Sequence, residues 1–517
     1  MTGSVGILAL AGACNPDLNV TNPNAPDVAR AIATPGDVRQ LIGSSFNTWY
    51  LTHQGNQEPD PSVMVGVMAD NLTMAYGNFG ARFNGQEPRV AYQNSSATGD
   101  GRVASYTYDG IYGALGAAND GLAAIKRGIR VALTKSAPDE TPQMQAFAWL
   151  VQGMSLGFEA QVFDKGFVVI EDTEPGTGAL QPYTAVATAA VASLDKAIAS
   201  AAGKTWTFPS EFTPGMTLTA DKVGRMANTM SARVLAYTPR TAAENAAVNW
   251  ARVLSYAEKG ISTGAAFDLQ IKGDGGNNWY DHFKLYNNLE SWIRVDQRVI
   301  QLADQTQPVV WTSTTPPPAV NSPDRRVGSA AAGGGTDFRF VSAVPYDPAR
   351  GVYFFSQWSH KRYIDHSYEV DDYALTTVPF VLAAENDLLI AEALVRTNGD
   401  KARAATLINK TRVGRGGLPA LSGGSSNNDL LAAIFYERDI ELWGTGGGQA
   451  WFDRRRIDTN LTYNGLPIGN TWGFRGGSNL QKGTPRHLPV PAKELETLGL
   501  PVYTYGGNTP NPIFPEM

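Results

Sequence analysis

The fold is decided by residues 382–413, which read LAAENDLLIAEALVRTNGDKARAATLINKTRV. Apolar residues recur every three or four positions on both sides of Asn398-Gly399-Asp400, a spacing that predicts two amphipathic helices joined by a short turn. Gly399 is expected to adopt the left-handed conformation that ends the first helix, and Asp400 to cap the second. Alanines where the two helices would cross favour a close-packed hairpin.

The same spacing recurs along most of the chain. It predicts helices over roughly 34–50, 108–125, 141–158, 183–202, 221–237, 243–260, 379–397, 401–413 and 428–443. Gly153 and Gly157 would let a neighbouring helix approach the third of these closely. No exact 34-residue period is visible, so we expect a mostly α-helical scaffold of degenerate, tetratricopeptide-like (TPR-like) helical pairs.

Two loop-rich blocks interrupt the helical pattern, at about 75–107 and 262–375. Both are dense in Gly, Pro, Asn, Asp and aromatic residues, and both are too long to be simple connections. We expect them to carry functional surfaces, and we expect little β-strand elsewhere.

The composition excludes several functional classes. The chain has 517 residues, with 42 Lys and Arg against 48 Asp and Glu, and its net charge of −6 argues against nucleic acid as a partner. It contains no run of about 18 apolar residues, which excludes a membrane-spanning helix. Its single cysteine, Cys14, excludes an internal disulfide and any Cys-rich zinc site.

Cys14 ends a short apolar segment, Val5 to Cys14, whose last residues are Leu-Ala-Gly-Ala-Cys. An apolar run that ends in small residues is typical of a secretory signal. This ending resembles the bacterial lipobox, in which the cysteine is acylated and becomes the mature N-terminus. No Lys or Arg precedes Arg30, so the usual basic start of a signal is absent. We expect residues 1–14 to be a shortened lipoprotein signal segment and residues 15–517 to form one domain.

The sequence offers no recognisable catalytic constellation, and we expect neither a cofactor nor a metal ion. The five histidines lie in no metal-binding or catalytic motif. The run Gly444–Gly448 lacks the lysine of a phosphate-binding loop. The loop from Asp274 to Asn278 lacks the late Glu of a calcium-binding EF-hand, but it offers oxygen ligands, and Ca²⁺ stays open there as an alternative. One alternative stays open, because the carboxylates Asp365, Glu369, Asp371 and Asp372 could supply the pair that a glycoside hydrolase needs.

The aromatic residues are more informative. In the two loop-rich blocks, Trp279 and Tyr280 follow a Gly/Asn run, Tyr76 and Phe79 flank Asn78, and Trp311 precedes three prolines. An aromatic face with amides nearby matches the flat face and hydroxyl edge of a sugar ring. We therefore predict that these five rings form a platform that stacks on sugars, with Trp279 and Tyr280 as its leading members. Because a flexible polar run precedes it, Trp279 is expected to be exposed. The alternative is that the rings fix long loops to the helices.

Five segments follow one another in a characteristic order and spacing: LAAENDLLIAEA (382–393), GDKARAATLINKTRVGRGGL (399–418), ERDIEL (437–442), DRRR (453–456) and LPVPAKEL (488–495). In that order they resemble the SusD/RagB family of surface glycan-binding lipoproteins. Upstream, Asn22-Pro23-Asn24, the helix from Tyr112 to Asn119 and the step Phe163–Gly166 are also similar to this family. The resemblance thus covers nearly the whole chain.

One departure from the family pattern lies after Leu442. Where the family has Glu-Gly-x-Arg, this chain has Thr445-Gly446-Gly447-Gly448, so the arginine that usually anchors this corner is missing, and Asp453 falls about two residues late. Glu437, Arg438 and Glu441 would lie within one helical turn, which predicts a structural charge network rather than a catalytic one.

The resemblance implies four TPR-like helix pairs with inserted loops, in a protein that a lipid tethers to the outer membrane with its body facing the cell exterior. It implies a SusC-like TonB-dependent transporter as partner and an oligosaccharide as ligand, or a peptide in the RagB branch. It implies a binding protein and not an enzyme. Two alternatives stay open: a glycoside hydrolase that uses the carboxylates near 365–372, and a helical scaffold that docks proteins and binds no small ligand.

Overall fold

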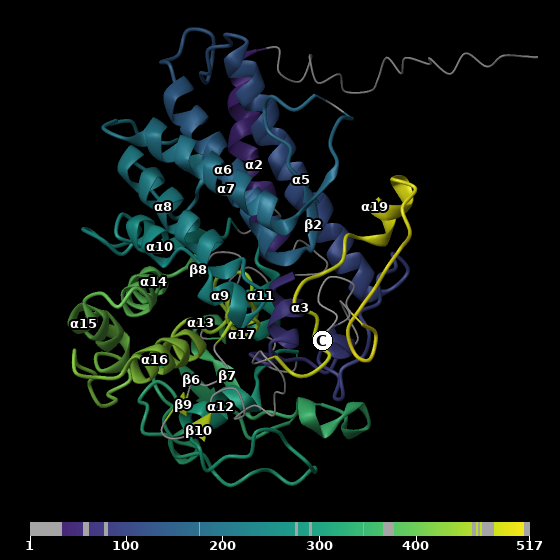
Figure 1. The fold of residues 1–517 in the computed structure, drawn as a ribbon, viewed down its shortest axis with the longest axis vertical. Coiled ribbons are helices and arrows are strands. Elements are labelled where there is room, and N and C mark those ends of the chain that lie inside the picture. The colour runs from purple at the N-terminus through teal and green to yellow at the C-terminus, as the bar shows by residue number, and fades with distance from the viewer. Residues whose placement is uncertain are drawn as a thin grey trace, which may run out of the picture.

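The first half of the molecule is a row of antiparallel helices, each packed on the next (Figure 1). The computed structural model describes residues 34–54, 61–76, 81–174, 176–274, 278–288, 292–344, 346–364, 377–457, 462–463, 466–467 and 480–510. The row runs through α2 (Pro35–Gln54), α5 (Gly99–Lys126), α6 (Thr141–Val162), α7 (Tyr183–Ala201) and α8 (Ala220–Tyr237). These helices stand side by side in the upper part of Figure 1.

The row continues through a short helix into the C-terminal third. After α9 (Ala242–Ala246), helix α10 (Trp250–Ala257) packs on both α8 and α14 (Ala383–Arg396). Helix α14 in turn contacts α15 (Lys401–Arg412) and α16 (Asn427–Ile440), which lie at the lower left of Figure 1. The shorter helices are α3 (Pro61–Met68), α4 (Ala81–Asn84), α11 (His282–Asn288), α12 (Gln297–Ala303), α13 (Lys361–Ile364), α17 (Gln449–Arg454) and α19 (Ala492–Thr497).

The described strands form only two-stranded antiparallel ladders. The pairs are β1 (Leu72–Thr73) with β5 (Arg294–Val295), β2 (Lys165–Phe167) with β3 (Leu180–Pro182), β4 (Leu269–Lys272) with β8 (Thr377–Val381), β6 (Phe338–Phe340) with β7 (Trp358–His360), and β9 (Thr462–Tyr463) with β10 (Leu466–Pro467). Most of these strands pair one loop segment with another near the end of a helix. The expectation of a mostly α-helical, TPR-like scaffold is confirmed.

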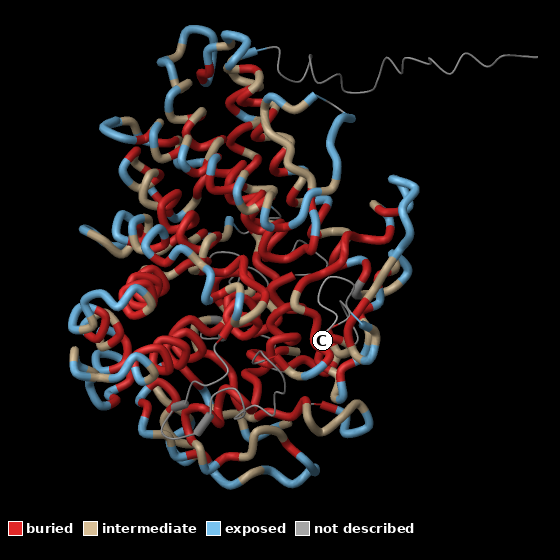
Figure 2. The backbone as a smooth tube through the Cα atoms, in the orientation of Figure 1, coloured by how far each residue is buried: buried red, intermediate tan, exposed pale blue. Residues whose placement is uncertain are grey.

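The buried backbone runs through the interior of both halves, while exposed residues lie on the outer turns and loops (Figure 2). Small residues set the helix spacing in the upper half, as predicted. A Cβ atom on Gly153 would lie 2.5 Å from a side-chain carbon of Leu194, and one on Gly157 would lie 2.6 Å from a methyl carbon of Val234. Glycine at these two positions therefore lets α6 approach α7 and α8 more closely than a larger residue would allow.

Three expected boundaries are wrong, each for a local reason. The helix expected over 243–260 is two helices, α9 and α10. The Asn249 side chain caps the start of α10, because it accepts a hydrogen bond from the Arg252 N–H. The helix expected over 379–397 begins only at Ala383, since residues 377–381 pair as strand β8 with β4. The loop block expected over 75–107 already contains the first turns of α5, which Thr98 caps.

The turn after α14 also differs from the prediction in one detail. Asn398, and not Gly399, holds the left-handed conformation, with φ of 53°. Asparagine tolerates this region better than most residues do. The Asn398 and Gly399 N–H groups donate to the carbonyls of Val395 and Leu394, which satisfies the helix end. Asp400 caps α15 as expected, accepting a hydrogen bond from the Arg403 N–H at 2.9 Å.

Candidate functional site

The ladder of β1 and β5 brings the two loop-rich blocks together. Its antiparallel register pairs Leu72 with Val295 and Thr73 with Arg294, so the chain after β1 runs beside the chain before β5. Just beyond the ladder, the rings of Tyr76 and Trp292 stack with their centroids 5.0 Å apart and an interplanar angle of 18°. Two segments more than 200 residues apart in the sequence thus share one aromatic contact.

This contact is the first step of a continuous row of rings. Trp292 stacks on Tyr286 at 5.0 Å with an interplanar angle of 2°, and Tyr286 stacks on His282 at 5.3 Å and 16°. Tyr280 then meets His282 edge to face at 4.8 Å. We call these five residues the aromatic row. Its two ends, Tyr76 and Tyr280, are half-buried, as is Trp292, whereas His282 and Tyr286 are buried.

The charges around the aromatic row suit contact with an uncharged ligand. Burial lowers the pKa of His282 to about 4, so this imidazole is neutral at neutral pH and behaves as another flat ring. At the far end, the Arg350 guanidinium lies 5.4 Å from the centre of the Tyr76 ring, and its Nη1 donates to the Ala75 carbonyl at 3.1 Å. The row can therefore offer flat faces to a sugar, with a cation beside one end.

Helix α2 holds the segment that carries Tyr280 and His282. The buried Asp281 carboxylate accepts hydrogen bonds from the Tyr50 hydroxyl at 3.0 Å and from the Gln54 amide at 3.2 Å. Its other oxygen accepts the Lys284 N–H at 2.8 Å, at the start of α11. Burial raises the pKa of Asp281. Because this carboxylate joins the loop to α2, the aromatic row has a fixed position on the scaffold.

The expectation that Trp279 is exposed is wrong. Its side chain is 8% exposed and lies in the core, with its ring 6.1 Å from that of Phe46 and 5.7 Å from that of Tyr50. The polar run before it does not keep the indole in solvent, because α2 offers an apolar face at this point. Trp311 is likewise only 3% exposed, and its ring meets Phe355 edge to face.

Of the other predicted platform residues, the structure brings Tyr76 and Tyr280 into one row, although it does so through three intervening rings. Phe79 lies outside the described residues, as do Asp365, Glu369, Asp371 and Asp372 of the hydrolase alternative and Cys14 of the lipobox. The predicted platform did not include Trp292, Tyr286 or His282. The spacing of His282 and Tyr286, four residues apart, was the available signal for two rings on one helical face.

The glycine corner after α16 packs beside the segment that carries the aromatic row. Here Gly444, Gly446, Gly447 and Gly448 all have positive φ, a conformation that glycine adopts readily. Arg233 of α8 holds the corner: its Nη2 donates to the Gly446 carbonyl at 2.7 Å, and it pairs with Glu385. An arginine from another helix thus anchors the corner for which the resemblance to SusD/RagB proteins implied a local arginine.

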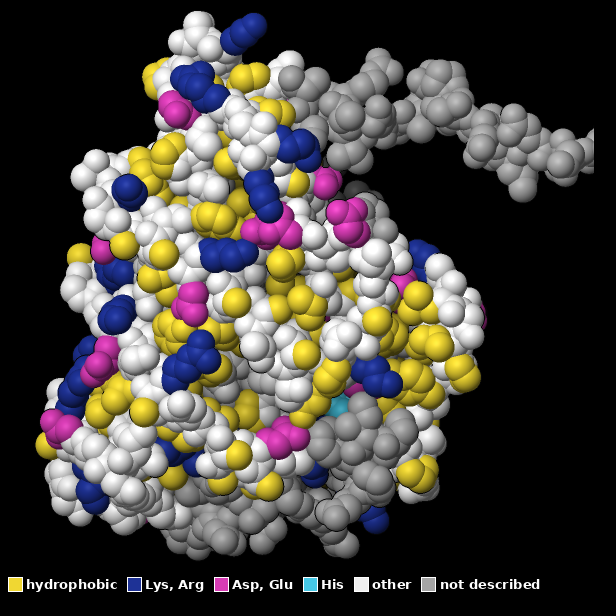
Figure 3. All heavy atoms as spheres, turned by 45° about the horizontal axis from the view of Figure 1, so that its top comes forward, with side chains coloured by type: hydrophobic (Ala, Val, Ile, Leu, Met, Phe, Trp, Pro, Cys, Tyr) yellow, Lys and Arg dark blue, Asp and Glu magenta, His cyan; other side chains and the backbone are white. Residues whose placement is uncertain are grey.

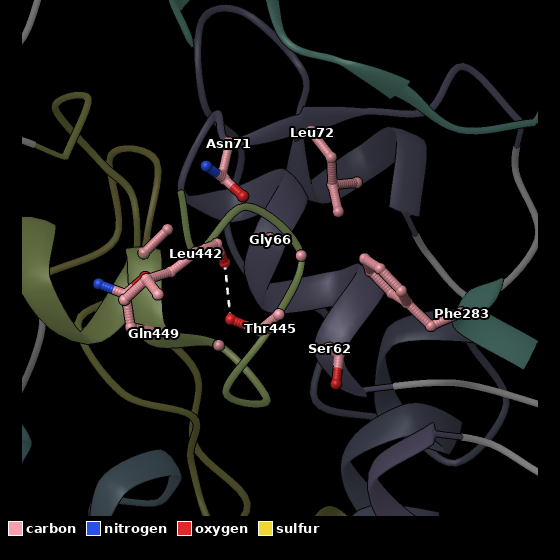
Figure 4. Close-up of a pocket in the computed structure, with 11 residues that line it drawn as sticks. Ser62, Gly66, Asn71, Leu72, Phe283, Leu442, Thr445 and Gln449 are labelled. Atoms are coloured by element: carbon pink, nitrogen blue, oxygen red, sulfur yellow. Dashed lines mark hydrogen bonds between the residues drawn. The ribbon is translucent and has the colours of Figure 1, made fainter. Parts of the chain in front are cut away.

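Figure 4 shows the small cavity behind this corner, with Phe283, Leu72 and Ser62 on one side and Thr445 and Gln449 on the other. Its volume of about 20 Å³ suits about one water molecule and no sugar. A glycan would therefore have to bind on the outer faces of the aromatic row and not in this cavity.

The Glu-Arg-x-x-Glu motif forms the buried charge network expected of it. Arg326 donates to Glu437 at 2.6 Å and to Glu441 at 3.1 Å, with Asp324 on its other side. Arg438 instead reaches Glu392 of α14 at 2.6 Å. All of these side chains are buried, and they form two groups of ion pairs, one around Arg326 and one around Arg438, so the motif joins helices rather than facing a ligand.

The described part of the chain bears on the chemistry in two respects. No group of three or more His, Cys, Asp or Glu side chains that could hold a metal ion occurs there. Among the helices described, none is both long and apolar enough to cross a bilayer.

Comparisons with known proteins agree with the fold. Residues 328–496 match the sequence model of the SusD family. The fold is similar to that of a SusD superfamily protein from Parabacteroides distasonis, with 12% identity and a TM-score of 0.62 over 89% of this chain and 96% of that one. It is also similar to a SusD-like carbohydrate binding protein from Bacteroides vulgatus (13% identity, TM-score 0.57, 83% and 85% coverage).

A third similar structure is the surface glycan-binding protein A from Bacteroides uniformis, with 14% identity and a TM-score of 0.56 over 89% of this chain and 97% of that one. A comparison with curated proteins finds no match to this chain.

Proposed function

We propose that this chain is a SusD/RagB-type surface protein that captures oligosaccharides and delivers them to a TonB-dependent outer-membrane transporter, because residues 328–496 match the model of the SusD family. The observation that carries the proposal is the aromatic row, a run of rings in contact that is built from both loop-rich blocks. Proteins of similar fold include a SusD-like carbohydrate binding protein and a surface glycan-binding protein. In this proposal the protein binds its ligand and does not change it.

The two ends of the row are its binding faces. Tyr76 and Tyr280 are half-buried, so each has part of its ring in solvent and part fixed by a neighbouring ring. A ring held in this way loses little conformational freedom when a sugar stacks on it. Trp279 and Trp311 are buried, and they serve the site by holding its loops in place. Phe79 stays a predicted member of the platform.

Calorimetry with a panel of oligosaccharides tests these roles. Replacing Tyr76 or Tyr280 by Ala removes one stacking face and should weaken binding roughly tenfold, which corresponds to about 1.4 kcal/mol. Tyr256→Ala is the matched control, because Tyr256 is also half-buried but lies on α10, which contributes no ring to the row. Unchanged affinity in both row variants would contradict the assignment. Binding of peptides in place of sugars would favour a RagB-type receptor.

The membrane anchor in this proposal is a lipid on Cys14, with residues 1–14 as the signal segment and 15–517 as one domain. One acyl chain binds a membrane only marginally, so stable attachment needs more than one chain on the cysteine. Cys14→Ser should therefore move the protein from the membrane fraction to the soluble fraction. Wild-type protein that is already soluble in its native host would contradict the anchor.

The transporter partner is proposed from the family. A complex that persists through purification needs an interface of well over about 1,000 Å². We therefore expect the protein to co-purify from native membranes with a large outer-membrane β-barrel. Repeated isolation of a lone monomer in mild detergent would contradict this part of the proposal.

A further inference from the structure

A groove on the helical scaffold lies among α7, α8, α9 and α10, on elements that contribute no ring to the aromatic row. Its volume is about 350 Å³, within the range of small-molecule sites in proteins. Most of its lining is apolar, with Val191 from α7, Val234 and Leu235 from α8, and Val248 between α9 and α10. In Figure 3, which turns the upper helices toward the viewer, hydrophobic side chains lie in the dips between polar ones on this side of the molecule.

The groove stays open because its rims carry small side chains. Ala187 and Thr188 of α7 and Ala247, which follows α9, line the groove, and none of the three has a side chain long enough to fill it. Ala187 is half-buried, and Thr188 and Ala247 are exposed. Val191 and Val234 are buried, whereas Leu235 and Val248 are half-buried, so the apolar lining is accessible to an apolar group of moderate size mainly at these last two residues.

The carboxylate in this groove is already occupied by protein donors. Glu244 accepts a hydrogen bond from the Tyr183 hydroxyl at 2.8 Å through one oxygen and from the Arg240 N–H at 2.6 Å through the other. Each oxygen of Glu244 therefore already has one protein donor, which leaves less of its charge open to a ligand cation. Glu244 therefore shapes the groove more than it recruits a charged ligand.

Arg252, in contrast to Glu244, has donors that are not used by protein partners. The Arg252 side chain is 47% exposed, and its contact with Asp195 is long, at 3.8 Å. Its Nη2 donates to the Tyr256 hydroxyl at 3.2 Å, and among the described residues its Nε and Nη1 have no hydrogen-bond partner. These two donors are available to an anion at the edge of an apolar groove.

From this combination we propose that the groove binds a small amphipathic carboxylate, with its alkyl or aryl body on the valines and its carboxylate on Arg252. The charge complementarity decides between this ligand and a neutral apolar one. The proposal does not depend on the proposed glycan function, because the two sites are built from different elements.

Calorimetry with octanoate and octanol on the full chain tests the proposal, since the two probes share one alkyl chain and differ in charge. We expect saturable octanoate binding by the wild type, and a loss of roughly tenfold or more in octanoate affinity in Arg252→Gln with octanol binding unchanged. Arg403→Gln is the charge control, because Arg403 of α15 is 44% exposed, pairs with Glu258 at the end of α10 and does not line the groove.

A second pair of variants tests the place of binding. Thr188→Phe fills the groove from its rim and should abolish binding of both probes. Thr406→Phe on α15 is its control, because both threonines are exposed on helices and both donate to the carbonyl four residues earlier at 2.9 Å. Absence of saturable octanoate binding, equal binding of both probes with no effect of Arg252→Gln, or equal loss in the two Phe variants would each overturn the proposal.

Discussion

The buried carboxylate of Glu392 stabilises the junction of the C-terminal helices, and we expect Glu392→Gln to be strongly destabilising. In the structure this carboxylate accepts hydrogen bonds from Arg438 at 2.6 Å and from Arg456 and Arg396 at 2.8 Å each. Burial alone would raise the pKa of Glu392, but the three arginines hold it well below its usual range. Glutamine keeps the shape of the side chain and removes its charge, so three guanidinium groups lose a shared counter-ion.

The size of the effect follows from the burial of the group. Breaking a buried ion pair by removing one partner costs about 3–5 kcal/mol. At about 2.1 cal/mol/K per residue, a chain of 517 residues has an unfolding entropy of about 1.1 kcal/mol/K, so each kcal/mol moves the Tm by about 1 °C. We therefore expect the Tm of Glu392→Gln, measured by calorimetry, to fall by about 3–5 °C.

Asp172→Asn is the control, because its pair with Lys126 is exposed, with side-chain accessibilities of 52% and 65%. A surface pair of this kind contributes about 0–1 kcal/mol. A Tm for Glu392→Gln that matches that of Asp172→Asn would show that the network tolerates the loss of its central charge, and would refute the argument.

Three further predictions concern the scaffold. Gly43→Ala should lower the free energy of unfolding by about 1–3 kcal/mol, because a Cβ atom there would lie 2.3 Å from the Phe212 ring. Gly116→Ala should raise it by about 0.5–1 kcal/mol, because a Cβ atom there would have nothing within 4 Å. Urea unfolding measures both changes, and the reverse order would contradict the packing. Burial lowers the pKa of His53 to about 3, so below about pH 6.5 the unfolded chain binds a proton that the folded chain does not bind. The free energy of unfolding should therefore fall as the pH drops from about 6 to 4, by about 1 kcal/mol per pH unit more than in His53→Phe. Parallel pH profiles of the two proteins would exclude His53 as the cause. Trp279→Ala should lower the free energy of unfolding in urea by about 3–5 kcal/mol, because its ring packs on Phe46 and Tyr50. A change below about 0.5 kcal/mol would instead support an exposed indole.

The helical scaffold could be predicted from the sequence because its signals are local. Apolar spacing, cap residues and turn residues within a dozen positions locate most of the helices in the first half of the chain and the hairpin of α14 and α15. The errors arose where a distant partner decided the outcome. Residues 377–381 became a strand because β4, more than 100 residues earlier, pairs with them.

The candidate site could be predicted only in part, for the same reason. The density of aromatic residues in the loop-rich blocks drew attention to Tyr76 and Tyr280, but it did not show that the β1–β5 ladder would place Trp292 beside Tyr76. The polar residues before Trp279 predicted an exposed ring, whereas α2, more than 220 residues away, supplies the apolar face that buries it. The local sequence indicates how flexible a segment is, but whether its side chains are buried depends on the distant segment that packs against it.

The central claim is that the protein binds oligosaccharides without cleaving them. The most direct test incubates the purified protein with a panel of oligosaccharides and measures both saturable binding, by calorimetry, and new reducing ends in the same samples. The account predicts saturable binding of at least one oligosaccharide with no increase in reducing ends. New reducing ends that scale with protein concentration, or no binding across the panel, would contradict it.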